Sequence, residues 1–351
     1  MNEKIWEQLD LSQVNALVGR MLETTGYGFT DITQEFAKGN FDKALGMLGA
    51  AITDICIPGL RESKNLLVGI LLLGLFSMLL RYTFGVVKNR QVAELAYYLV
   101  YLLLILLLLE SFGEIMEMGR EVLSLSKQFM AALVPAYCLS VSLAGGAAGA
   151  AVHYELVVML LFGIDYILAG LLLPVTQTYV FLVVMDGVDE KHRMKEFIRL
   201  LGRIISWGIR ICLTVTVMLS GLQNAVTSKL DGVQKTVFQK AVGAVPGIGD
   251  MSEAVTEALL GSAGLIRNSI GAAAMLFMFL LVFRPVWSLL CISVTMKVAA
   301  ACVRVMGENV LSDTIAGIGE GGILVMRIVT CAAIAFCICV AMTMFVAGGG
   351  H

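Results

Sequence analysis

Residues 223–268 read QNAVTSKLDGVQKTVFQKAVGAVPGIGDMSEAVTEALLGSAGLIRN and form a long polar interval in an otherwise strongly hydrophobic chain. In its first half, apolar residues recur every three or four positions, which predicts a helix with one apolar face. Proline and glycines in residues 245–250 should end that helix, and Asp250 with Glu253 resembles the capping box that starts another. We predict two amphipathic helices joined by a sharp turn, the alternative being an ordinary packed loop of a transporter. The predicted assembly surface consists of Val226, Leu230, Val233, Val237, Pro246, Gly247 and Gly249.

The composition is that of an integral membrane protein. Hydrophobic residues make up 58% of the 351 residues and charged residues only 15%, whereas a soluble domain averages about 25% charged. The mean hydropathy is +0.86, and apolar runs reach the length of about 18 residues that indicates a spanning helix. We therefore predict an all-α fold: a polytopic transmembrane helical bundle with amphipathic interfacial helices. The lipid bilayer is then one of its partners.

Several classes of function lack their sequence signatures. The net charge of −2, without a basic stripe, argues against a nucleic-acid partner. The 3 histidines are scattered, and the 8 cysteines lie mostly in apolar runs without a CxxC pair, so we expect neither a metal site nor a disulfide framework. The chain contains no P-loop, G-x-S-x-G or HExxH motif. We expect no cofactor and no enzymatic activity.

The pattern along the chain divides it into four stretches. Residues 1–65 are predicted to be an extracytoplasmic amphipathic helical region, 66–222 an N-terminal membrane bundle, 223–268 an extracytoplasmic helical hairpin, and 269–351 a C-terminal membrane bundle. Residues 111–127 are expected to form an amphipathic helix outside the membrane, and residues 307–322 a flexible polar link. Hydropathy leaves open whether Pro174 separates two spans or kinks one. The apolar stretches are 66–80, 93–109, 129–143, 156–173, 175–185, 204–222, 270–283, 286–303 and 323–347.

Lysine and arginine in short loops predict the orientation. Residues 81–90 and 186–203 are rich in both and should face the cytoplasm, which requires an odd number of crossings between Glu110 and Asp186. Three crossings, at 129–143, 156–173 and 175–185, would satisfy this. Residues 1–65, 111–127 and 223–268 then lie on the far side. Because an amino-terminal tail of this length rarely crosses unaided, we expect a cleaved signal peptide, and an in-frame stop immediately before Met1 would contradict this.

Four polar side chains lie within apolar runs: Asp165, Gln177, Arg210 and Lys297. A charge at the bilayer centre costs at least about 2.5–3.5 kcal/mol, so such groups should face protein or water. They could line a polar pathway, form an ion pair such as Asp165 with Lys297, or reach the interface by snorkelling, as Arg210 is well placed to do. The small residues around Gly145 and Gly149 are candidates for close helix packing, for a break, or for a re-entrant tip.

Two stretches carry a family resemblance. Residues 235–271, KTVFQKAVGAVPGIGDMSEAVTEALLGSAGLIRNSIG, contain a V-P-x-x-G turn, an amphipathic helix and N-[AS]-[IV]-G. Residues 284–322, RPVWSLLCISVTMKVAAACVRVMGENVLSDTIAGIGEGG, contain P-x-x-x-L and G-x-x-x-x-x-D-x-x-x-G-I-G. In these motifs and in its order of spans the chain resembles the stage III sporulation protein AE family. Members of that family usually carry an amino-terminal signal sequence, and this chain shows none.

The resemblance implies a multi-pass protein of the mother-cell membrane surrounding the forespore. It implies a channel or scaffold subunit of a secretion-like complex. The implied partners are other proteins of the same sporulation operon, including a separate ATPase, a forespore membrane protein across the intermembrane space, and further copies of this chain. Two other hypotheses follow from the residues. One is an independent secondary transporter with a midplane polar site around Asp165, Gln177, Lys297 and the Pro174 break. The other, a membrane enzyme such as a protease, has no supporting motif.

The polar interval leads to a first prediction. A charge on its apolar face, as in Leu230→Asp or Val237→Asp, should disrupt complex assembly without preventing membrane insertion. These positions are predicted to contact partner proteins, whereas insertion depends on the apolar stretches, which both variants leave unchanged. Membrane fractionation measures insertion, and co-purification of the complex measures assembly. Normal assembly of both variants would show that the interval is a plain loop.

Overall fold

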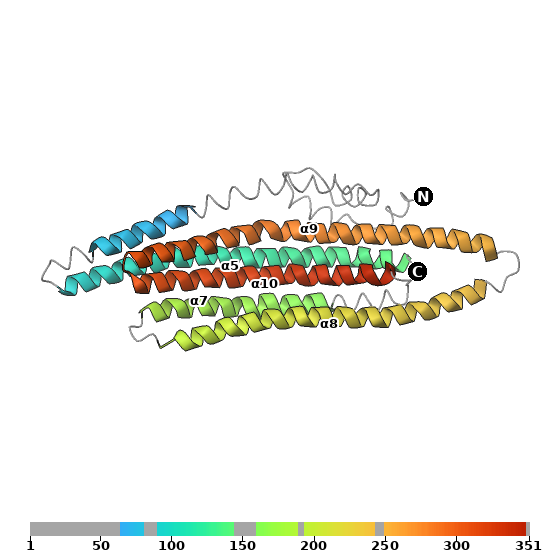
Figure 1. Cartoon of the computed structure of the whole chain (residues 1–351), viewed down its shortest axis with the longest axis horizontal. Helices are drawn as coiled ribbons and strands as arrows, with labels where there is room; N and C mark the ends of the chain where they lie inside the picture. Colours follow the sequence, from blue (N-terminus) through green and yellow to red (C-terminus); the bar gives the residue numbers. More distant parts are fainter. Residues whose placement is uncertain (1–63, 81–89, 144–158, 189–192, 243–248, 349–351) are drawn as a thin grey trace.

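The computed structural model describes residues 64–80, 90–143, 159–188, 193–242 and 249–348. Every regular element within them is a helix, which confirms the predicted all-α fold. Residues 1–63, Gly145, Gly149 and the predicted turn residues Pro246 and Gly247 lie outside the described residues. The elements, which run along one long axis in Figure 1, are a helix at Lys64–Leu80, α5 (Arg90–Leu143), η1 (Leu168–Leu172), α7 (Leu173–Val188), α8 (Lys195–Val242), α9 (Gly249–Val305) and α10 (Asn309–Gly348).

Five of the helices are long and apolar enough to cross a membrane by length and composition. They carry many large apolar side chains on their outer surface, such as Leu102, Trp207 and Met218. Exposed apolar surface on this scale indicates contact with lipid or with other proteins. The apolar windows lie within Tyr98–Leu133, Met159–Val188, Lys195–Gly221, Asn268–Val305 and Asn309–Ala341.

The helices are longer and fewer than the predicted spans. Residues 93–109, 111–127 and 129–143 all belong to α5, a helix of 54 residues with Pro135 inside it. Residues 159–173 and 175–185, from two of the predicted stretches, belong to one helix, Met159–Val188. Of the two alternatives left open at Pro174, the structure shows one continuous helix in place of two separate spans. Between the end of α5 and Asp186, the described chain runs back along the bundle once, in the Met159–Val188 helix. One passage is an odd number, as the distribution of lysine and arginine in the loops requires.

α5 continues past Glu110 because its buried face does not change there. Phe112, Ile115, Met116, Val122 and Leu123, which lie on one side of the amphipathic helix predicted for residues 111–127, are all buried. The same helical spacing begins earlier, at Tyr101, and ends at Leu133. Only the exposed face changes from leucine to charged residues. A hydropathy average over both faces therefore falls at Glu110 and predicts two segments, although one continuous buried face runs through the whole helix.

Pro174 does not end the helix that contains it. The five residues of η1, just before Leu173, form a π-helical turn in which the Leu173 N–H donates to the carbonyl of Leu168. Proline lacks an N–H and its ring clashes with the carbonyl four residues earlier, and a widened turn relieves both problems. The helix therefore runs from Met159 to Val188, in place of the break on which the transporter hypothesis relied.

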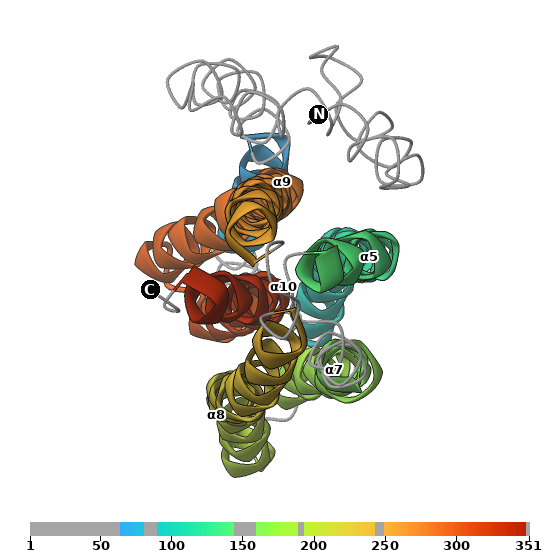
Figure 2. The same ribbon diagram turned by 90° about the vertical axis from the view of Figure 1, so that its right-hand side faces the viewer.

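α10 is the central helix of the bundle, packed against α5, α7, α8 and α9. In the end-on view of Figure 2 it lies between α9 and α5 on one side and α7 and α8 on the other. In its apolar window 61% of the residues are buried, against 22% for α8. The predicted flexible link at residues 307–322 is wrong, since α10 begins at Asn309.

Glycines allow this close packing. A Cβ on Gly317 would lie 2.5 Å from Val183 of α7, and a Cβ on Gly321 or Gly322 would collide with Val180 or Ser293, respectively. Small residues at helix interfaces let backbones approach closely, which strengthens packing where lipid removes the hydrophobic driving force. The glycine-rich sequence is thus a contact surface.

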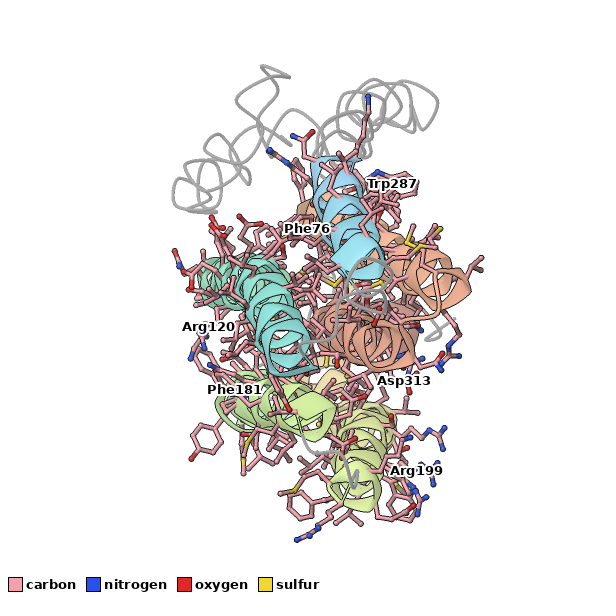
Figure 3. All side chains as sticks on the ribbon, turned by 90° about the vertical axis from the view of Figure 1, so that its left-hand side faces the viewer. Phe76, Arg120, Phe181, Arg199, Trp287 and Asp313 are labelled. Carbon is pink, nitrogen blue, oxygen red and sulfur yellow. The ribbon has the colours of Figure 1, made fainter. Side chains whose placement is uncertain are left out.

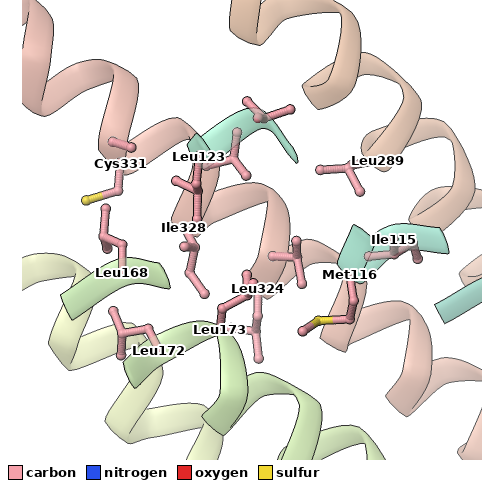
Figure 4. Close-up of a cluster of buried hydrophobic side chains, with 14 of the residues drawn as sticks. Ile115, Met116, Leu123, Leu168, Leu172, Leu173, Leu289, Leu324, Ile328 and Cys331 are labelled. Atoms are coloured by element: carbon pink, nitrogen blue, oxygen red, sulfur yellow. The ribbon is translucent and has the colours of Figure 1, made fainter. Parts of the chain in front are cut away.

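Beyond these glycines, large side chains fill the core between the same helices. Figure 4 shows Leu168, Leu172 and Leu173 pointing toward Leu324 and Ile328 of α10. Farther along, the rings of Phe129 and Phe336 pack edge to face with centroids 6.0 Å apart. These contacts keep α5 and the Met159–Val188 helix at fixed heights relative to α10.

The helix ends show which loops share a side of the bundle. α5, α8 and α10 begin, and α7 and α9 end, at the left of Figure 1, which we call the turn end. Leu80, Arg90, Val188 and Lys195, which flank the two basic loops, therefore lie at one end, as the charge argument requires. At the opposite end α8 and α9 extend beyond α5 and α10. These extensions carry residues 223–242 and 249–268 as continuations of the apolar helices, so two of the predicted stretch boundaries fall inside helices. The four-stretch division stays a prediction.

The glycine contacts lead to a second prediction. Gly321→Val should destabilise the bundle by about 1–3 kcal/mol, because overpacking must push α7 away from α10. Gly163→Val is the matched control, since a Cβ on the exposed Gly163 meets nothing within 4 Å. Thermal unfolding in detergent measures both variants. Equal melting temperatures for the two would contradict the glycine-mediated contact.

Candidate functional site

A tight turn at one end of the bundle joins α9 to α10. Gly307, with φ of 89°, ends α9. Its N–H donates to the carbonyl of Arg304 at 3.0 Å, and the Glu308 N–H donates to that of Val303 at 3.4 Å. This pair of hydrogen bonds is the Schellman pattern, which favours glycine at the left-handed position. The arrangement explains the first glycine of the G-x-x-x-x-x-D-x-x-x-G-I-G motif.

The other motif residues hold the two helices together. Asp313 forms an ion pair with Arg304, and the Ser312 hydroxyl donates to the carbonyl of Ala300 at 2.9 Å. Ile318 is fully buried, and a Cβ on Gly319 would lie 3.3 Å from the carbonyl oxygen of Ser293. The motif therefore specifies an α9–α10 hairpin, and its conformation indicates a structural role.

Lys297 pairs with Glu320 across the same hairpin. Its Nζ lies 2.6 Å from Oε2 of Glu320, with the two side chains 43% and 38% exposed. The sequence suggested a pair between Lys297 and Asp165, and this is wrong. Glu320 was assigned to the flexible link, so its position beside Lys297 emerges only when that link is helical.

Asp165 pairs instead with Lys127 of α5, whose Nζ lies 3.2 Å from Oδ2. The Asp165 side chain is only 16% exposed, and the Lys127 ammonium also lies 5.3 Å from the ring centroid of Phe162. Cation–π contact and ion pairing both compensate a charge that has lost water. Lys127 belongs to the segment predicted to lie outside the membrane.

Gln177 contacts the same face of α5. The Arg120 guanidinium donates to its Oε1 at 3.3 Å and lies 3.8 Å from the carboxylate of Glu117. Asp165 and Gln177, twelve residues apart on one helix, are separated by roughly 18 Å. Both tie the Met159–Val188 helix to α5 at different heights.

Arg210 is exposed on α8. The predicted polar candidates thus lie on three different helix surfaces: two beside α5, one between α9 and α10, and one on α8. The structure does not bring them together into one midplane site. Sequence reasoning missed their partners Lys127, Arg120 and Glu320, because no periodic signal links residues that far apart.

Near the turn end a cavity of about 130 Å³ contains polar groups, including Asp186, Lys195 and Thr314. Asp186 is buried and accepts a hydrogen bond from the Met194 N–H at 3.1 Å. The cavity is smaller than the roughly 300–1,000 Å³ typical of small-molecule sites. Among the described residues, no three His, Cys, Asp or Glu side chains are grouped to hold a metal ion.

A comparison with known protein families finds a match along most of the chain. The sequence profile described as Stage III sporulation protein AE matches residues 27–347. The chain belongs to the stage III sporulation protein AE family. The match includes both stretches that carried the resemblance, and with them the α9–α10 hairpin. Family membership implies a role in sporulation.

A curated relative is Stage III sporulation protein AE of Bacillus subtilis (strain 168), which is 22% identical over 244 residues. The aligned region covers 69% of this chain and 61% of the relative, so the chain spans less than two thirds of that protein's length. No solved structure matches this chain.

The ion pair with α5 leads to a third prediction. Lys127→Met should lower the free energy of unfolding by about 1–3 kcal/mol, because it leaves the largely enclosed Asp165 carboxylate without its partner. Adding Asp165→Asn removes that orphaned charge, so the double variant should lose less than the sum of the two single changes. Unfolding in detergent of all four proteins measures the coupling. Strict additivity would show that the pair contributes nothing.

Proposed function

We propose that this chain is an integral membrane subunit of a channel-like or secretion-like complex between mother cell and forespore, acting as a channel or scaffold component required for endospore development. The main support is its family together with the five long apolar helices found in the described part of the chain. In this proposal it lies in the mother-cell membrane around the forespore. It is not an enzyme, in keeping with the missing catalytic motifs.

The observation that carries the complex-subunit role is the length of α8 and α9. They have 48 and 57 residues, whereas a bilayer core of about 30 Å is crossed by about 20 residues. Their polar ends would project roughly 30 Å from the apolar stretches at 1.5 Å per residue. A rigid helical projection suits contact with another protein better than the passage of a small solute does.

The proposed partners are other proteins of the same sporulation operon, including a separate ATPase, a forespore membrane protein reached across the intermembrane space, and further copies of this chain. The projecting ends of α8 and α9 carry the predicted assembly surface around Leu230 and Val237. If the basic loops at the turn end face the cytoplasm, these ends face the forespore.

A secondary transporter remains the second candidate, because Asp165 and Gln177 lie within an apolar helix. Two observations weaken it: the Pro174 region is a continuous helix, and the polar candidates lie on separate surfaces. Purified chain in liposomes separates the two functions. Gradient-driven uptake of a small solute, abolished by Asp165→Asn, would favour the transporter.

The proposed function leads to a fourth prediction. In a spore-forming host, deleting the gene for this chain should block forespore development and sharply reduce the yield of heat-resistant spores, and the wild-type gene should restore both. Vegetative growth is the control, since a sporulation subunit is not needed then. Normal forespore development and spore yield in the deletion strain would refute the proposal.

A further inference from the structure

The exposed face of α5 changes character at Glu110. Before it, Leu99, Leu103 and Leu106 are exposed, and after it Glu110, Glu114, Glu117 and Glu121 follow at helical spacing on the same face. The opposite face stays buried throughout. The change therefore has nothing to do with the core of this chain and concerns what surrounds α5.

The exposed face of α8 changes in the opposite sense. Its first turns carry Lys195, Arg199 and Arg203 at helical spacing, beside the exposed Phe197 and Leu200. Beyond Arg203 the exposed side chains are largely apolar, as at Ile204, Trp207 and Ile211. Arg210 is the exception, a cation among these apolar side chains.

Contacts through the core place the two charged faces at the same height. A Cβ on Gly202 would lie 3.5 Å from Tyr179, and the next residue, Val180, faces Gly321, which also faces Phe112 of α5. Arg203 and Glu114 therefore lie in nearly the same cross-section of the bundle.

About two helical turns farther along, a second set of contacts also places α5 and α8 residues at the same height. A Cβ on Gly208 would lie 2.7 Å from Leu172, and one on Gly119 would lie 3.6 Å from Leu173. Arg210 and Glu121 each follow these glycines by two residues. They too share a cross-section.

The spacing of the charges is the same on both helices. Arg199, Arg203 and Arg210 are separated by four and seven residues, and so are Glu110, Glu114 and Glu121. Both helices begin at the turn end, so α5 and α8 run in the same direction. Copies related by an axis along the membrane normal keep the same heights, so all three pairs meet at once.

The outer sides of α5 and α8 lie at different margins of the bundle. In Figure 3, viewed along the bundle, Arg120 of α5 and Arg199 of α8 lie at opposite margins of the molecule. Within the described part of the chain, Glu110, Glu114, Glu121, Arg203 and Arg210 form no ion pair, and Arg199 pairs only with its neighbour Glu196. Arg210 lies within an apolar run, where an unpaired charge at bilayer depth is unfavourable, and pairing with a carboxylate would remove that penalty.

We propose that α5 of one copy of this chain packs against α8 of the next, with Glu110, Glu114 and Glu121 paired to Arg199, Arg203 and Arg210. Because the two surfaces differ, the contact is heterologous, and repeating it around an axis produces a ring when the rotation closes. The inference is tested on the purified chain and does not depend on a role in sporulation.

A charge-exchange experiment provides the fifth prediction. Glu114→Arg/Glu121→Arg and Arg203→Glu/Arg210→Glu each place like charges across the contact. Wild-type protein in nanodiscs or mild detergent should be oligomeric by light scattering, and each double variant alone should be monomeric. A mixture of the two variants should recover the oligomer, because the altered, basic α5 of the first variant then faces the altered, acidic α8 of the second, and the two unaltered surfaces face each other.

Arg284→Glu/Arg327→Glu is the matched control, since it makes the same charge change at exposed positions of α9 and α10 and should leave the oligomer intact. A monomeric wild type, double variants that assemble alone, or folded variants whose mixture stays monomeric would each overturn the proposal.

Cross-linking keeps the proposal testable if the charge-exchanged proteins fail to fold. In a background without native cysteines, Glu114→Cys/Arg203→Cys treated with a short thiol cross-linker should give a ladder of linked chains. Each single-cysteine protein should stay monomeric. No ladder from the pair, or dimers from Glu114→Cys alone, would contradict an α5–α8 contact.

Discussion

The close approach of α10 to its neighbours is the constraint on which the rest of the structure depends. Gly317, Gly319, Gly321 and Gly322 present backbone where Val183, Val180 and Ser293 leave no room for a Cβ. Apolar side chains gain little from association in lipid, so tight packing of this kind has to supply the specificity. Once α10 is fixed against α5, α7 and α9, the height of every other residue along the bundle follows.

Because the helices are held at fixed heights, charges that are scattered in the sequence become neighbours in the structure. Asp165 meets Lys127, Gln177 meets Arg120 and Lys297 meets Glu320, each pair joining two helices. These contacts hold outer helices in place and do not converge on a site. The stripes left on α5 and α8 are different in kind, because they face outward at one height with opposite charge. The polar chemistry of this chain is thus divided between internal bracing and an outward surface suited to assembly.

Much of the fold could be predicted from the sequence. The apolar stretches, the buried side of residues 111–127 and a helix start near Asp250 all agree with the structure. Predictions failed where an average over both faces hid a continuous buried stripe, as at Glu110, and where a glycine-rich stretch was interpreted as a flexible link. Hydropathy left the effect of Pro174 open. Gly317–Gly322 and Pro174 lie inside helices because close packing and a π-helical turn accommodate them. Local propensity carries no information on such tertiary compensation.

The sequence by itself determined the helical class, the membrane character and the family, because these depend on composition, periodicity and motif order along one chain. It also supplied the charges and their spacing. Only the tertiary structure decided that the polar interval continues α8 and α9, which charges pair, and which stripes share a height. Those facts depend on the register between helices, which is set by contacts between residues up to about two hundred positions apart, such as Phe129 with Phe336.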